Sequence, residues 1–295
     1  MAERASKSRG RVVLQMRGGR GSPIALEAAF RMARSLESEL EGLFVEDEHL
    51  LSLAAMPFAR EVSFTGRRTR PLSEDLVRRE MRAASAAMHR EFERLARAVG
   101  VPARYDVVRD EPERALRSAS AAASVLAIGE PVTAAGRAEL RAVTACLSEM
   151  TACLLVGREA RRARGRIVVA LDAFATLPPL VRMAERIARD GQEEIVAVLA
   201  GETVADRERA VELVRSLVPA AVPLRIEAAA EAEATLGEVA RRLGGGLVIA
   251  GLGGTLLPGE AEVVRLTAML ECPLLLSRGA GEEAQPDEGS TSART

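Results

Sequence analysis

The segment "RIVVALD" (166–172), followed by "LPPLVRMAERIARDG" (177–191), decides the fold of this chain. The first piece is a short run of apolar, mostly β-branched residues, which is typical of a buried strand. The second piece has apolar residues at helical spacing and begins near prolines, which suit a first helical turn. A buried strand that leads through a turn into an amphipathic helix is the opening step of a parallel α/β sheet.

The same step occurs near the N-terminus, where "RVVLQM" (11–16) precedes "SPIALEAAFRMARSLES" (22–38). Later segments also match in pairs: "SVLAIGEP" (124–131) with "GLVIAGLGG" (246–254), and "CLSEMTACLLVGR" (146–158) with "TAMLECPLLLSR" (267–278). Each half therefore alternates five expected strands with four helices. We predict an α/β protein made of two tandem doubly wound five-stranded parallel sheets with helices on both faces.

The repeat sets the expected domains. Domain 1 covers 11–158 and domain 2 covers 166–278, with a polar linker at 159–165 and disordered ends at 1–10 and 279–295. Domain 1 carries an insertion, 46–73, that domain 2 lacks. Its stretch "LLSLAAMPFA" (50–59) is too apolar to remain in water unaided. The insertion is therefore either a flap over its own domain or a contact surface for a partner or a second copy.

Composition excludes several functions. The chain has 295 residues and a net charge of -1, which argues against a dedicated nucleic-acid binder. Aromatic residues make up 2%, too few to stack single-stranded bases, and Lys7 is the only lysine. The start has no apolar signal core, and no apolar run reaches bilayer length. We expect a cytoplasmic protein with no nucleic-acid partner and no membrane partner.

Catalytic groups are scarce. Cys146, Cys153 and Cys272 are an odd number without metal or redox spacing, so reduced, buried thiols are expected. His49 and His89 belong to no cluster at metal spacing, and no Gly-x-Ser-x-Gly elbow occurs. We predict no catalytic residue, no metal site and no enzymatic activity.

Three further pieces carry a family resemblance. They are "VALD" (169–172), the helix pattern "RMAERIARD" (182–190) with "RMARSLESE" (31–39), and the closing "LECPLLLSR" (270–278). Their order, occurring twice over 11–278, resembles the universal stress protein family in a tandem two-domain form. The resemblance implies a Rossmann-like fold of the adenine nucleotide alpha hydrolase type and a non-enzymatic stress-response or regulatory role. It also implies pairing of the two domains or a homodimer, because domains of this family commonly dimerise.

The resemblance also implies a site. In members that bind ATP, the first strand ends in an aspartate. After the fourth strand they carry Gly-x-x-Gly, then nine residues of any type, and then Gly followed by Ser or Thr. Domain 2 retains Asp172, Gly251 and Gly254, while Gly259 is the best match to the later glycine. Glu260 occupies the position at which ATP-binding members have the Ser or Thr whose hydroxyl contacts phosphate. We therefore expect a degenerate site at Asp172, Gly251, Gly254 and Gly259, whose cofactor would be ATP or another adenine nucleotide.

Domain 1 departs further from the family pattern. Arg17 aligns with Asp172, and no Gly-x-x-Gly follows Gly129, so we expect no nucleotide there in the family manner. "MRGGRGS" (16–22) is either an anion-binding loop or a plain turn.

Two other functions remain open. One is a pure interaction module that uses 46–73 to contact an unknown protein partner, and the other is an ATP hydrolase or nucleotidyl-transfer enzyme.

Overall fold

The computed structural model describes residues 10–17, 22–63, 69–129, 136–147, 150–172, 177–199, 204–228, 236–254 and 256–278. The ends predicted to be disordered, 1–10 and 279–295, lie outside these residues except for Gly10. Residues 18–21 of the glycine-rich "MRGGRGS" segment lie outside them as well. Within the described ranges, no helix has both the length and the apolar character needed to span a bilayer.

The described part of residues 11–158, called half one below, alternates strands and helices. Its elements are β1 (Arg11–Arg17), α1 (Pro23–Ser35), β2 (Glu39–Asp47), α2 (Glu48–Ala54), β3 (Arg60–Val62), β4 (Thr69–Pro71), α3 (Glu74–Val99), β5 (Ala103–Asp110), α4 (Pro112–Ser120), β6 (Val125–Gly129), α5 (Gly136–Cys146) and β7 (Ala152–Val156). The insertion supplies α2, β3 and β4, which adds one helix to the four expected.

Residues 166–278, called half two, repeat the pattern without an insertion. The elements are β8 (Arg166–Leu171), α6 (Leu177–Gly191), β9 (Ile195–Leu199), α7 (Val204–Leu217), β10 (Leu224–Ala228), α8 (Leu236–Arg242), β11 (Gly245–Leu252), α9 (Glu260–Met269) and β12 (Leu274–Arg278). Helix α8 is described from Leu236 onward, and residues 229–235 lie outside the described ranges.

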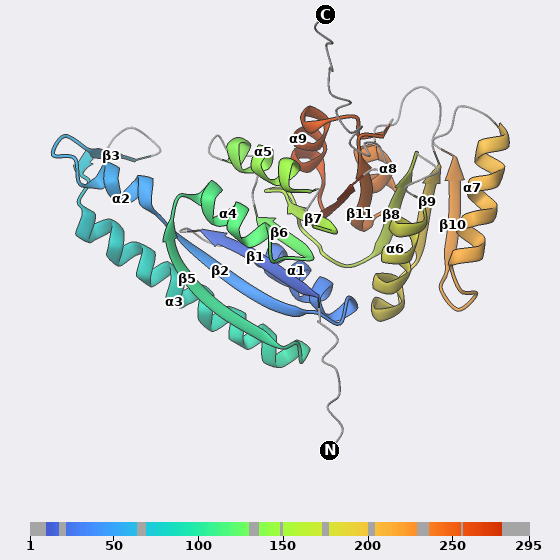
Figure 1. The fold of residues 1–295 in the computed structure, drawn as a ribbon, viewed down its shortest axis with the longest axis horizontal. Helices are drawn as coiled ribbons and strands as arrows, with labels where there is room; N and C mark the ends of the chain where they lie inside the picture. The colour runs from blue at the N-terminus through green and yellow to red at the C-terminus, as the bar shows by residue number, and fades with distance from the viewer. Residues whose placement is uncertain are drawn as a thin grey trace, which may run out of the picture.

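The prediction of two separate five-stranded sheets is wrong in one respect, because these ten strands form a single sheet, while β3 and β4 of the insertion pair only with each other. Its order is β10-β9-β8-β11-β12-β7-β6-β1-β2-β5 (Figure 1). Each half contributes the same internal strand order, 3-2-1-4-5. The sheets merge because β7 and β12 pair antiparallel, with Leu154 opposite Leu275. Both are the last strands of their halves, and an apolar edge strand with unpaired backbone groups gains hydrogen bonds by joining another edge.

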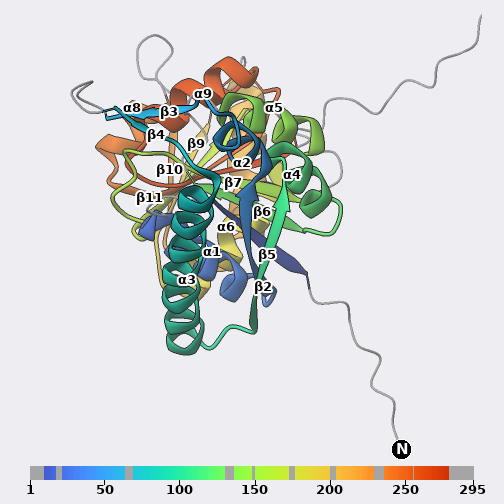
Figure 2. The same ribbon diagram turned by 90° about the vertical axis from the view of Figure 1, so that its left-hand side faces the viewer.

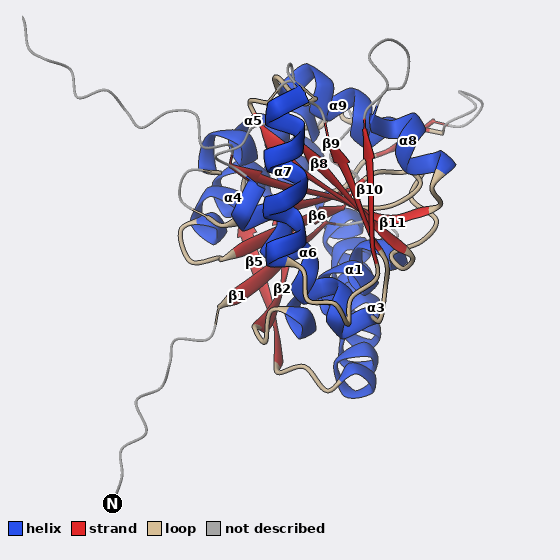
Figure 3. Cartoon of the chain, turned by 90° about the vertical axis from the view of Figure 1, so that its right-hand side faces the viewer, coloured by secondary structure: helices blue, strands red, loops and turns tan. Residues whose placement is uncertain are grey.

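Helices cover both faces of the merged sheet. One buried cluster joins the sheet to α1, α3, α6 and α7, and the other joins it to α4, α5, α8 and α9. Figure 1 shows β5 and β10 as the two outer strands, and Figure 3 shows α7 beside β10. Parallel strands require this double cover, because both of their faces are apolar.

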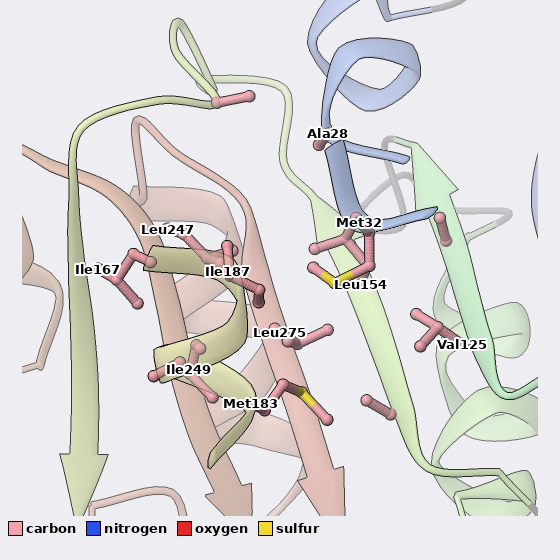
Figure 4. Packing of buried hydrophobic residues seen from close by; sticks show 14 of the residues in the cluster. Ala28, Met32, Val125, Leu154, Ile167, Met183, Ile187, Leu247, Ile249 and Leu275 are labelled. Carbon is pink, nitrogen blue, oxygen red and sulfur yellow. The ribbon is translucent and has the colours of Figure 1, made fainter. Parts of the chain in front are cut away.

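The two halves also pack through helices α1 and α6, which share one core (Figure 4). At the edge of this contact, the Arg31 guanidinium donates to the Ala163 carbonyl and forms an ion pair with Glu193. Only 7% of the Arg31 side chain and 11% of that of Glu193 are exposed. Burial lowers the pKa of Arg31, and the Glu193 carboxylate partly offsets this. The pair therefore depends on both partners being present.

The insertion folds back onto α3. Leu51 and Ala54 of α2 are buried against Val77 and Met81 of α3. Figure 2 shows α2, β3 and β4 gathered at the start of α3. The insertion also has exposed apolar side chains, those of Leu50, Leu53, Met56, Phe58 and Val62. The segment is thus a flap on its own half that also presents apolar side chains to solvent.

The cysteine thiols lie in the core. Cys153 is in β7, and Cys272 lies two residues before the start of β12. Burial raises the pKa of the Cys153 thiol far above its usual range and that of Cys272 to about 12. We expect iodoacetamide to modify these two thiols only as the protein unfolds, because the thiolate is the reactive form. Peptide mapping after labelling with and without urea measures this, and fast labelling of Cys153 in the native protein would contradict it.

Candidate functional site

The carboxyl ends of the first and fourth strands of each half define the candidate sites. In an order such as 3-2-1-4-5, the chain reverses direction across the sheet between strands one and four. These strands are β1 and β6 in half one, and β8 and β11 in half two. Ligands of doubly wound proteins bind at such switch points. Each half therefore offers one candidate position.

In half two, Asp172 and Gly254 lie in direct contact. Asp172 follows β8, and its Oδ2 accepts the Leu256 N–H at 2.7 Å. A Cβ added to Gly254 would lie 2.2 Å from Oδ2, so only glycine admits the carboxylate here. Gly253 has φ +90°, and its N–H donates to the Leu257 carbonyl at 2.9 Å, which closes the turn. The predicted aspartate is thus hydrogen-bonded within the loop that follows β11.

The other two predicted residues lie apart from this contact. Gly251 is buried within β11 and stands opposite Ser277 of β12. Gly259 is the N-cap residue of α9, with an extended φ of -170°. A Cβ added to Gly259 meets no atom within 4 Å, so the Asp172 carboxylate does not reach it. The structure therefore brings together two of the four predicted residues.

Glu260 faces the other half. Its carboxylate lies 3.4 Å from the Arg141 guanidinium of α5. Arg265, the cation nearest in sequence, pairs with Glu262 at 4.0 Å on the surface of α9. The start of α9 is thus engaged in ion pairs within the protein, one of which links the two halves.

In half one the switch point opens into a cavity of about 1170 Å³. Its described lining includes Leu14 to Arg17 of β1, Ile128 and Gly129 of β6, and Ser22 at the start of α1. Helix α3 adds Val77, Met81, Ala84 and Met88. The insertion adds Asp47, Leu50, Glu61 and Leu72. Its volume exceeds the roughly 300–1,000 Å³ of ordinary small-molecule pockets.

This cavity was not predicted from the sequence. A second, smaller one of about 630 Å³ lies at α7, β9 and β10, lined by Arg207, Val211 and Ile226 among others. Neither of these two cavities is lined by Asp172, Gly251, Gly254 or Gly259. The signal that could have pointed to half one is the insertion, which places an additional apolar segment over one switch point only.

The histidines support no metal site. His49 lies 3.2 Å from Glu111, and His89 stacks on Tyr105 and lies 3.3 Å from Glu93. Throughout the described ranges, no group of three or more His, Cys, Asp or Glu residues could hold a metal ion.

Comparison with known proteins shows the fold. No family model matches the chain, and no curated protein matches it either. Among solved structures, a universal stress protein from Archaeoglobus fulgidus DSM 4304 aligns with a TM-score of 0.56 at 14% identity, over 92% of this chain and 97% of that one. A putative universal stress protein from Pseudomonas aeruginosa UCBPP-PA14 aligns with a TM-score of 0.55 at 16% identity, over 92% and 94%. A functionally unknown protein from Pseudomonas aeruginosa PAO1 aligns equally well, over 92% and 93%. The chain therefore has an α/β fold like that of universal stress proteins.

Proposed function

We propose that this chain is a cytoplasmic regulatory protein of the universal-stress type that acts by binding a small ligand in half one, without catalysis. The observation that carries the proposal is the large cavity at the carboxyl ends of β1 and β6. Its position at a switch point and its mostly apolar wall are features of ligand pockets. The fold shared with universal stress proteins supports the regulatory part.

The cavity wall supports binding over catalysis. Among its described residues there is no histidine and no cysteine, and the one serine is Ser22. The Ser22 hydroxyl accepts the Ala25 N–H at 3.3 Å and so caps α1. A nucleophilic mechanism needs a hydroxyl or thiol beside a base, and the described lining residues provide no such pair.

The test is a titration with N-phenyl-1-naphthylamine, a neutral probe that fluoresces in apolar surroundings. The wild-type protein should bind it, and Ala84→Phe, which fills the cavity from α3, should weaken binding about tenfold. Ala87→Phe is the matched control, because Ala87 lies on the exposed side of the same helix. Failure of the wild type to bind, or equal binding by all three proteins, would refute the proposal.

A second candidate function is a residual adenine-nucleotide site in half two, which the contact between Asp172 and Gly254 favours. A nucleotide there would have to compete with the Leu256 N–H for the Asp172 carboxylate. Titration with labelled ATP tests this candidate. Micromolar binding that is lost in Asp172→Ala would establish it, whereas no binding at millimolar ATP would remove it. Release of ADP in the presence of Mg²⁺ would contradict the non-enzymatic proposal.

A further inference from the structure

We propose that the outer strand β5 pairs antiparallel with β5 of a second copy of this chain, so that the two ten-stranded sheets join across a twofold axis at Val107. The proposal concerns assembly and does not depend on the ligand proposed for half one. It is carried by the open edge of β5, one exposed valine and the charge pattern along the strand.

The outer edge of β5 is open in the described part of the chain. β5 (Ala103–Asp110) pairs with β2 along its whole length, and no described strand pairs with its other side. Figure 2 looks at this edge and shows β5 between α3 on one face of the sheet and α4 on the other. A strand in this position presents a row of backbone N–H and C=O groups to an incoming strand. β5 has eight residues, whereas β10 at the opposite edge of the sheet has five.

Val107 gives this edge an apolar centre. It lies near the middle of β5, and its residue is 50% exposed. The other large apolar side chains found exposed in the described ranges belong to the insertion or to α9, and none of them lies on a strand of the large sheet. A strand of a second copy would cover Val107, and burial of apolar area favours association.

The side chains of β5 fall on the two faces of the sheet. Tyr105 packs with the core on the α3 side, and Val108 packs with the core on the α4 side. Because side chains alternate along a strand, Val107 belongs to the α3 face, whereas Arg104 and Asp110 belong to the α4 face. A twofold axis perpendicular to the sheet keeps each face on its own side. Residues of the two copies that lie opposite one another therefore come from the same face.

The charges of β5 favour one register. With Val107 on the axis, Arg104 of each copy lies opposite Asp110 of the other, and residues 104–110 of both copies are paired. If one copy slides by two residues, Asp106 lies opposite either Asp106 or Asp110 of the other copy. Cross-strand pairs of opposite charge stabilise a sheet, and like charges directly opposite destabilise it. The register centred on Val107 is therefore preferred over its two neighbours.

Arg104 and Asp110 already have partners within the chain and retain capacity for more. The Arg104 guanidinium lies 2.6 Å from Glu41 of β2 and 3.3 Å from Asp106. Asp110 lies 3.2 Å from Arg114 of α4. A guanidinium has five N–H donors and a carboxylate has two acceptor oxygens, so each group can also serve a second copy. Charged side chains on an edge strand deter pairing with other strands and select a strand whose charges match.

The same mode of pairing already joins the two halves of the chain. β7 and β12 are edge strands of their halves, and they pair antiparallel. Pairing of β5 with its copy would repeat this arrangement at the outer end of half one. Because β5 carries charges beside its apolar centre, we expect a reversible dimer of folded chains, as is typical of the more polar interfaces.

Sedimentation equilibrium of the full chain measures the assembly. The wild type should form a dimer of twice the 31.4 kDa mass of the chain. Val107→Asp brings two carboxylates together on the axis and should raise the dimer Kd about tenfold or more. Val62→Asp is the matched control and should leave the Kd unchanged, because Val62 is a valine of the insertion with a similar exposed fraction, 59%. A monomeric wild type, a dimer that persists in Val107→Asp, or loss of the dimer in Val62→Asp would overturn the proposal.

Thiol cross-linking with a short bismaleimide tests the register. Val107→Cys chains should cross-link to one another. Arg104→Cys and Asp110→Cys chains should cross-link when mixed but not when alone, because like positions then lie roughly 20 Å apart along the strands. Arg225→Cys on β10 is the control for random collision, and the native cysteines are buried, so the wild type serves as the blank. Absence of the Val107→Cys product, or a product from Arg104→Cys alone, would contradict the assigned register.

Discussion

Arg31→Met is expected to lower the free energy of unfolding by about 3 kcal/mol, because it leaves Glu193 charged in a mostly buried position. Among the described residues, Glu193 would keep the Gly165 N–H, which donates to its Oε1 at 2.9 Å. The Ala163 carbonyl would also lose its donor. These groups join α1 of half one to the linker and to the segment before β9, so the loss falls on the contact between halves. Urea denaturation followed by circular dichroism measures it.

The double variant Arg31→Met/Glu193→Met should recover much of that loss, because it removes the unpaired charge and fills the space with apolar groups. Arg94→Met is the control for removing an arginine from an ion pair, since Arg94 and Glu91 lie exposed on α3 at 2.6 Å. This control should change stability little. Equal losses in Arg31→Met and Arg94→Met would show that burial of the Arg31 pair is unimportant.

Gly254→Ala is expected to lower the free energy of unfolding by about 2 kcal/mol, as overpacking at a tight contact does. The added Cβ would lie 2.2 Å from Asp172 Oδ2. The carboxylate would have to move and release the Leu256 N–H, which is then left without its acceptor. Thermal and urea unfolding measure the change.

A double-mutant cycle isolates this contact. In the Asp172→Ala background, Gly254→Ala should cost much less, because the carboxylate that obstructs the Cβ is gone. Gly259→Ala is the matched control from the same loop, since its φ is extended and its surroundings are open. Strictly additive effects of Asp172→Ala and Gly254→Ala would contradict a direct contact between them.

Most of the local structure could be read from the residues. The strands at 11–16 and 166–172 and the helix at 177–191 occur as β1, β8 and α6, within one residue at each end. Apolar runs, helical spacing and caps act over a few residues, so they leave a clear pattern. Ser73, for example, caps α3 through the Leu76 N–H, and Gly100 ends it with φ +72°. The order of these elements then restricts the sheet to a few topologies.

Only part of the candidate site could be predicted from the sequence. Asp172 and Gly254 meet because the first and fourth strands of half two are neighbours, which the strand order implies. Their spacing in sequence says nothing of the closed state, in which the carboxylate fills the space above Gly254 and binds the Leu256 N–H. That state depends on the conformation of the glycine turn after β11. Because Gly253 has no side chain, no residue pattern predicts its φ of +90°.

Residue order thus specified the strands, the helices, the repeat and the two switch points, because each depends on local propensity and periodic burial. Three features emerge only when distant residues meet. They are the pairing of β7 with β12 into one sheet, the closed contact at Asp172, and the half-one cavity under the insertion. Each depends on contacts between segments that are far apart in the sequence. For example, α2 packs against α3, and the half-one cavity is lined by residues of α2, α3 and β1. The free energy of packing decides such contacts. Packing depends on how the side chains of several segments fit together in three dimensions, so no single segment of the sequence determines it.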